Sequence, residues 1–233
     1  MPEILYQDAH YIAINKPSAL LVHRSPVDRH ETRFAVQLLR DRVGRYVYPV
    51  HRLDKPTSGV LLFAFAPDFI APLSGALEKE YLAVVRGWCD NDGVIDHPIC
   101  YKIDKKSDDV RDKKRPCKEA VTAYETVART RIPHSAGRYD NERYSLVRAF
   151  PKTGRKHQLR RHFKHIAHHI IGDTKYGRGE HNKLFRKVYN SDRLLLHARR
   201  MRFTHPYTQE RIVIEAGFDT TFLRILELFK ENG

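Results

Sequence analysis

The chain has 233 residues, with 42 Lys or Arg against 28 Asp or Glu, and therefore a net charge of +14. This length supports one large domain or two closely joined ones, and the basic excess predicts a polyanionic partner. The three cysteines (Cys89, Cys100 and Cys117) are odd in number and form no Cys-x-x-Cys pair. That argues against a disulfide framework and a cysteine zinc site, and it favours a reducing compartment. With no signal peptide and no apolar run of membrane-spanning length, we expect a cytoplasmic protein without membrane contact.

The N-terminal region is predicted to form a strand hairpin followed by a helix. Apolar residues at 4–6 and 11–14 flank a polar break, which is typical of two paired strands. Residues 32–43 carry an apolar stripe at helical spacing. We expect Thr32 to cap the start of this helix and Gly44 to end it.

The most informative stretch begins at His51. His51, Arg52 and Asp54 precede a Pro-Thr-Ser-Gly turn, and an apolar run from Val60 to Ala66 follows at once. Such a run predicts a buried strand, so the polar residues should lie on a loop held against the core, where catalytic groups are often found. An Asp before a turn is also typical of a simple turn cap, which accepts bonds from backbone amides. The residue pattern alone leaves both interpretations open for Asp54.

The remaining elements follow from similar patterns. We expect a short helix within 68–77 and strands near 80–88, 121–127, 143–150, 194–198, 202–206 and 211–215. Residues 102–118 are dense in charge and almost without apolar side chains, which predicts a surface loop. A final helix should follow a cap at Asp219. Its expected buried residues are Phe222, Leu223, Ile225, Leu226 and Phe229.

Residues 143–172 contain no acidic side chain, but eight are Lys or Arg and five are His. A helix that opens within 153–162 would turn Leu159, Phe163, Ile166 and Ile170 toward the core. His157, Arg161, Lys164 and His168 would then share an outward cationic face suited to phosphate contacts. The histidines of this stretch also invite a metal interpretation. Because no Cys or carboxylate joins them at ligand spacing, we expect no metal.

Several of these segments together resemble a known enzyme family. His51-Arg52-Leu53-Asp54 with Thr57-Ser58-Gly59 resembles the signature loop of the RluA-type pseudouridine synthases. Further matches are Asn15-Lys16-Pro17, Lys79-Glu80-Tyr81, the segment Thr-Gly-Arg-Lys-His-Gln-Leu-Arg at 153–160, Gly-Asp at 172–173 with Tyr-Gly at 176–177, and Leu-His-Ala at 196–198. The resemblance covers essentially the whole chain.

The resemblance implies an α+β fold. A long mixed, mostly antiparallel β-sheet with flanking helices would carry a central catalytic cleft. Residues 1–233 would form a single catalytic domain whose two halves share one sheet, without an appended N-terminal RNA-binding domain.

The resemblance also implies roles for particular residues. Asp54 would be the catalytic carboxylate, Tyr81 would line the active site, and Arg155 would pair with Asp54. A nearby arginine favours the ionised form that a catalytic carboxylate needs. Arg52 would fill the space left by a flipped uridine. The other expected RNA-contacting residues are His51, Lys156, His157, Arg161 and Lys164. Tyr81 is also explained as an ordinary strand aromatic, and the Gly-Asp segment at 172–173 is interpreted as a shaped loop without a direct chemical role.

The implied activity is isomerisation of uridine to pseudouridine in tRNA. Motif spacing is most similar to family members that modify uridine 65 in the TΨC stem. The reaction needs no redox change, phosphate energy, metal or cofactor, and the protein is expected to act as a monomer. The alternatives are a ribosomal RNA pseudouridine synthase of the same family and a non-catalytic RNA-binding factor. The set Asp54, Tyr81 and Arg155 argues against the second alternative. A hydrolase using Asp54 and His51 would lack a nucleophile.

Overall fold

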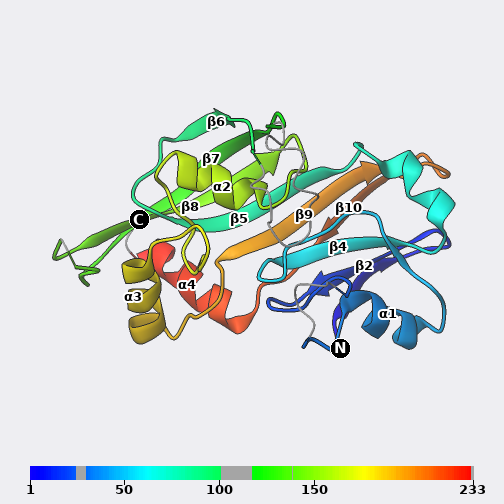
Figure 1. The fold of residues 1–233 in the computed structure, drawn as a ribbon, viewed down its shortest axis with the longest axis horizontal. Helices are drawn as coiled ribbons and strands as arrows, with labels where there is room; N and C mark the ends of the chain where they lie inside the picture. The colour runs from blue at the N-terminus through cyan, green and yellow to red at the C-terminus, as the bar shows by residue number, and fades with distance from the viewer. Residues whose placement is uncertain (25–29, 101–116, 138, 232–233) are drawn as a thin grey trace, which may run out of the picture.

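The computed structural model describes residues 1–24, 30–100, 117–137 and 139–231. Within these ranges ten strands form one sheet, and along its main path the order is β1-β2-β4-β9-β5-β8-β7-β6 (Figure 1). The strands are β1 (Glu3–Gln7), β2 (Tyr11–Lys16), β3 (Tyr48–Pro49), β4 (Ser58–Ala64), β5 (Glu78–Arg86), β6 (Asp92–Asp96), β7 (Val121–Ile132), β8 (Glu142–Pro151), β9 (Leu196–Thr204) and β10 (Arg211–Glu215). The helices are α1 (Ala35–Val43), α2 (Gln158–His165), α3 (Gly179–Tyr189) and α4 (Thr220–Glu231), with short 3-10 turns η1 (Pro67–Phe69) and η2 (Ala71–Leu73). The predicted α+β fold is confirmed.

The two halves of the sheet meet where β4 pairs with β9. This pairing is parallel and short, joining Ser58 to His197 and Gly59 to Ala198, whereas the other strand pairs are antiparallel. Gly59 has φ +108°, and a Cβ atom placed on it would lie 2.2 Å from the carbonyl oxygen of Ala198. Only glycine satisfies both requirements. The joint therefore fixes the chain five residues after Asp54 at the middle of the sheet.

Each face of the sheet has its own core. The front face, defined here by Ile14, Leu61, Ala83 and Val147, packs with residues of α1 and α2. On the back face, residues of β5 and β8 pack against α3 and α4, and a further cluster forms between β2, β4, β9 and β10. Figure 1 shows α1 beside β2 and β4, and the other three helices around the opposite half of the sheet.

Several boundaries differ from the predictions. The helix predicted from residue 32 starts at Ala35 after Phe34, without a side-chain cap, while Gly44 ends it in the left-handed conformation as predicted. α2 ends at His165, because Ala167 adopts a left-handed φ of 61°. Ile170 is buried beyond that end, in a bridge to Val85, not on the helix.

The last helix confirms its predicted cap, because the Asp219 Oδ1 accepts the backbone N–H of Phe222 at 2.8 Å. Phe222, Ile225 and Phe229 are buried, and Leu226 packs against them. Leu223 is 47% exposed, so its predicted burial is wrong. The reason is the helical period, since the buried positions recur at three and four residues and leave 223 on the outer side.

The cysteine prediction also needs correction. Cys100 and Cys117 form a disulfide, and Cys89 is a buried free thiol. An odd number of cysteines excludes a fully paired set but does not exclude one pair. The predicted loop at 102–118 lies almost entirely outside the described residues. No helix in the described part of the chain is long and apolar enough to cross a membrane.

Candidate active site

A cavity of about 440 Å³ gathers residues that are far apart in the sequence. Its lining comes from the loop before β4, from the start of β5 and from the segment between β8 and α2. The predicted site residues that line it are His51, Arg52, Asp54, Tyr81, Arg155, Lys156 and His157. Arg161 and Lys164 lie farther along α2 and are not part of the lining. Cavities of this size suit a small ligand or a single nucleotide unit.

The Asp54 loop is tied to the end of β2 by a buried lysine. Lys16 is 0% exposed, and its Nζ donates to the carbonyl oxygens of Pro17, Leu20 and Lys55 at 2.9, 2.8 and 3.1 Å. Burial and the charge of Arg193 lower the pKa of Lys16 to about 7, whereas the Asp54 carboxylate acts in the opposite direction. Because Lys55 directly follows Asp54, these bonds hold the carboxylate loop in place.

The arginine that bonds Asp54 is Arg160. Its Nη1 donates to Asp54 Oδ2 at 3.2 Å, while its Nε and Nη2 donate to the two carboxylate oxygens of Asp173 at 2.8 Å each. Burial alone would lower the pKa of Arg160, but the bonds to Asp173 and Asp54 raise it. Burial would likewise raise the pKa of Asp173, and Arg160 lowers it. The guanidinium is thus held rigidly by Asp173 with one edge turned to Asp54.

The predicted pairing of Arg155 with Asp54 is therefore wrong. Arg155 Nε donates to the Glu119 carbonyl oxygen at 2.9 Å, and its backbone N–H donates to Gln158 Oε1 at 3.0 Å. His157 has a left-handed φ of 56° just before α2 and redirects the chain. Arg155 consequently faces the beginning of β7, whereas Arg160, on the first turn of α2, faces the carboxylate.

Tyr81 lies on β5 between its neighbours Ala149 on β8 and Ala198 on β9, and its side chain lines the cavity. It is 9% exposed. Burial raises the pKa of Tyr81, and the Asp54 carboxylate raises it further. The hydroxyl therefore stays protonated at neutral pH. This favours a ring contact and a neutral hydroxyl over a phenolate base.

The two predicted histidines are neutral and differ in position. His157 Nε2 lies 3.7 Å from Asp54 Oδ1, and its Nδ1 is 2.9 Å from the Tyr176 hydroxyl. Burial lowers the pKa of His157 to about 4, against the pull of Asp54. His51 Nε2 accepts the backbone N–H of Leu62 at 3.1 Å, and burial lowers the pKa of His51 to about 3. His51 thus serves the strand beside the cavity, which does not support its predicted RNA contact.

The other predicted RNA-contacting residues lie outside the carboxylate network. Arg52 and Lys156 are exposed where the cavity opens. Arg161 Nη2 donates to the Cys100 carbonyl oxygen at 2.7 Å. Lys164 is exposed, with Nζ 6.0 Å from the centre of the Tyr176 ring. They form a basic border from the cavity along the outer side of α2.

Residues 10–165 match the family model described as RNA pseudouridylate synthase. The chain belongs to this family. It is 47% identical to tRNA pseudouridine synthase C of Vibrio parahaemolyticus, over 98% of this chain and 95% of the relative. It is 48% identical to tRNA pseudouridine synthase C of Pasteurella multocida, over 97% and 96%. Human RNA Pseudouridylate Synthase Domain Containing 4 has a similar structure, with a TM-score of 0.69 at 25% identity over 98% of this chain and 93% of that one. Human RNA Pseudouridylate Synthase Domain Containing 1 has a TM-score of 0.70 at 23% identity over 94% and 84%, and shares the fold.

Three residues of this pseudouridylate synthase site were not identified from the sequence: Arg160, Asp173 and Gln158. Asp173, which the sequence predicts to belong to a loop without a direct chemical role, holds the arginine that bonds Asp54. Gln158 anchors the cavity wall, donating through Nε2 to Val121 O and Thr122 Oγ1 at 3.0 Å each. The sequence does contain one signal for Asp173 as the partner of a buried arginine. Asp173 is the first acidic residue after the acid-free stretch 143–172, so it was the nearest carboxylate along the chain for a buried arginine there.

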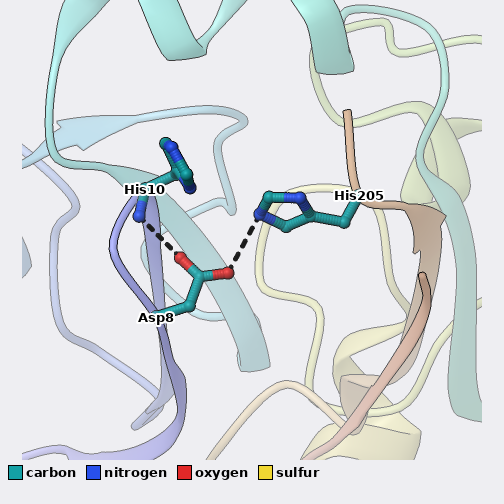
Figure 2. A group of neighbouring side chains, drawn as sticks. All are labelled: Asp8, His10 and His205. Atoms are coloured by element: carbon teal, nitrogen blue, oxygen red, sulfur yellow. Dashed lines mark hydrogen bonds and ion pairs between the residues drawn. The ribbon is translucent and has the colours of Figure 1, made fainter. Parts of the chain in front are cut away.

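A second group of ligand-type side chains, Asp8, His10 and His205, lies at the β1–β2 and β9–β10 turns (Figure 2). Asp8 Oδ1 accepts two backbone N–H groups at 2.7 Å, and Oδ2 is bonded by the Tyr6 hydroxyl. His205 Nδ1 accepts two backbone N–H groups, and its Nε2 lies 3.1 Å from Asp8 Oδ2. Because both Asp8 oxygens already accept hydrogen bonds, we interpret the group as a structural contact that joins the two turns.

Proposed function

We propose that this chain isomerises uridine to pseudouridine in tRNA, at position 65 of the TΨC stem, with Asp54 as the catalytic carboxylate. The substrate assignment rests on relatives named tRNA pseudouridine synthase C, which align with nearly the whole chain. The observation that carries the chemistry is the Asp54 carboxylate in the central cavity, bonded at 3.2 Å by a buried arginine. A surface that only binds RNA gains nothing from an aspartate directed at a phosphate-bearing ligand.

The reaction breaks the N1–C1′ bond of uridine, turns the uracil over and forms a C5–C1′ bond. The proton leaves C5, and N1 gains one, so atoms and electrons balance without an oxidant or a co-substrate. Asp54 acts as an anion, as a nucleophile at C1′ or C6 or as a base at the sugar. Arg160 orients the carboxylate and places a positive charge beside it, and Tyr81 offers its ring to the uracil.

A uridine in a stem must leave the helix before Asp54 can reach it. Extrusion costs on the order of a few kcal/mol. Arg52 is exposed and lines the cavity, which supports its proposed role of filling the vacated stack. Contacts from Lys156, Arg161 and Lys164 to phosphates would offset the cost. With about six phosphate contacts, affinity should fall on the order of a thousandfold between 50 and 200 mM salt.

The experiment incubates the protein with unmodified tRNA and, separately, with ribosomal RNA, and then maps pseudouridine at nucleotide resolution. We expect one new pseudouridine in tRNA, at position 65, and none in ribosomal RNA. Modification of ribosomal RNA alone would reassign the substrate. Tight tRNA binding without any pseudouridine would instead identify a non-catalytic RNA-binding factor.

A further inference from the structure

Trp88, the single tryptophan of the chain, sits on the surface just beyond β5. It is 43% exposed, yet its surroundings are fixed. Its indole Nε1 donates to the Thr130 carbonyl oxygen at 3.3 Å, and the Gly87 N–H before it donates to Arg143 O at 2.7 Å. The next residue is fixed as well, because the Cys89 N–H donates to Ser145 Oγ at 3.0 Å. Trp88 is therefore a pre-positioned aromatic side chain that is partly exposed to solvent.

Two arginines lie against this ring. The Cζ atoms of Arg131 and Arg143 are 5.5 and 5.1 Å from the centre of the ring, within cation–π range. They are also direct cross-strand partners on β7 and β8. Like charges directly opposite each other destabilise a sheet. In the part of the chain that the structure describes, neither guanidinium has a carboxylate within ion-pair distance. This arrangement is suited to receiving an anion from outside.

The cavity around Trp88 supports that interpretation. It measures about 560 Å³ and includes Arg86, His168, Asp140 and Glu142 in its lining. Glu142 is turned away into its own loop, where Oε1 accepts the backbone N–H of Ala136 at 3.2 Å. Asp140 is exposed. Three arginines therefore line the cavity against two carboxylates, and the net charge of its lining is positive.

The Trp88 cavity lies on the same face of the sheet as the Asp54 cavity. Along β8, Arg143, Val147 and Pro151 share the front face because alternate residues point to one side. Arg143 lines the Trp88 cavity, and Pro151 lines the Asp54 cavity. Eight residues of strand separate them, a distance of about 26 Å. α2 lies between the two cavities, since Gln158 at its start lines the Asp54 cavity and His168, just after its end, lines the Trp88 cavity.

We propose that Trp88, Arg131 and Arg143 form a second RNA-binding site, which takes an unstacked nucleotide of the substrate RNA with its base against the indole and its phosphate on the two arginines. This inference rests on the proposed function, because it takes the bound RNA to be the substrate. The exposed basic side chains on the outer side of α2 give the RNA backbone a path between the two cavities. Base stacking on an aromatic ring combined with arginine–phosphate contacts is a common way to hold unpaired nucleotides.

Trp88 reports on this site directly, because it is the only tryptophan. The experiment titrates the protein with unmodified tRNA while recording both Trp88 fluorescence and the anisotropy of labelled tRNA. We expect quenching that follows the same binding curve as the anisotropy. Trp88→Ala should raise Kd by about five- to 150-fold, the usual range for the loss of one stacked base. Trp88→Phe, which keeps a ring, should retain most of the affinity.

The arginines are tested by the salt dependence of Kd. Arg143→Ala should lower the slope of log K against log salt by about one, as expected for one lost phosphate contact. Arg224→Ala is the matched control, because Arg224 is an exposed arginine on α4 at the back of the sheet, and its slope should not change.

The outcomes separate this inference from the proposed function. If tRNA is isomerised but Trp88 fluorescence is unchanged on binding and Trp88→Ala keeps the wild-type Kd, the second site is refuted and the function stands. If quenching and weakened variants are found without isomerisation, the second site stands and the catalytic assignment fails. If anisotropy shows no tRNA binding, both are overturned.

Discussion

Replacing Arg160 by methionine tests how the site is built. The substitution would leave Asp173, whose side chain is 1% exposed, as a buried carboxylate without its partner. Breaking a buried pair from one side costs about 3–5 kcal/mol of unfolding free energy. Asp54 contributes less to this cost, because its side chain is 17% exposed and its ion pair is partly screened. Urea denaturation should therefore show a large loss of stability for Arg160→Met.

Adding Asp173→Asn separates folding from chemistry. The asparagine removes the buried, unpaired negative charge. It keeps an Oδ1 that can accept the backbone N–H groups of Lys175 and Tyr176, which in the wild type donate to Asp173 Oδ1 at 2.9 Å each. The double variant should thus return to within about 1–2 kcal/mol of the wild type. Its single-turnover rate of tritium release from C5-tritiated uridine in tRNA should stay at least about a hundredfold low, because Asp54 still lacks its cation.

Arg155→Met is the matched control. Its side chain bonds a backbone carbonyl at a partly exposed position, so stability should change by less than about 1 kcal/mol. The single-turnover rate at saturating tRNA should remain within a few-fold of wild type. The reasoning is refuted if the double variant regains its rate together with its stability, or if Arg155→Met loses as much rate as Arg160→Met.

Three further changes test other parts of the account. Tyr81→Leu should slow tritium release far more than Tyr81→Phe, because the ring face remains in the second variant; equal losses would show that the hydroxyl is the important group. Gly59→Ala should destabilise the protein by at least about 1–3 kcal/mol, since its Cβ would clash with Ala198; Gly179→Ala, which meets open space, is the control. Burial lowers the pKa of His197 to about 4, so the unfolded chain binds the additional proton between pH 6.5 and 4. Stability should therefore fall across that interval as pH decreases, by on the order of 3 kcal/mol from this residue, and a urea midpoint that rises on acidification would contradict it.

Local patterns predicted individual strands and helices, whereas the fold and the role of Asp54 came from the family resemblance. Apolar runs bounded by turns predicted the central strand that follows Asp54, and the family motifs placed Asp54 and Tyr81 at one cavity. These inferences need only the order of residues along a short segment. Boundaries set by tertiary contacts could not be obtained in this way. The early end of α2, for example, depends on a left-handed Ala167 that no local propensity predicts.

The arginine assignment failed for a similar reason. Arg155 and Arg160 both lie in the matched segment, and helical spacing alone does not say which one faces the carboxylate. The choice depends on the left-handed His157, which turns Arg155 toward β7, and on Asp173, which reaches Arg160 from the following loop. Both are properties of the packed chain. Periodicity placed Leu159 and Phe163 in the core correctly but gave no reason to bury a guanidinium beside them.

The measurement that tests the central claim most directly is single-turnover tritium release from C5-tritiated uridine in tRNA by the wild type and Asp54→Asn. Asparagine has nearly the same shape but no negative charge, and tRNA affinity measured by anisotropy should be unchanged or slightly tighter. We predict release of one tritium equivalent per tRNA by the wild type and no release above background by Asp54→Asn. Release by the variant at a rate near that of the wild type would contradict the assignment of Asp54 as the catalytic carboxylate.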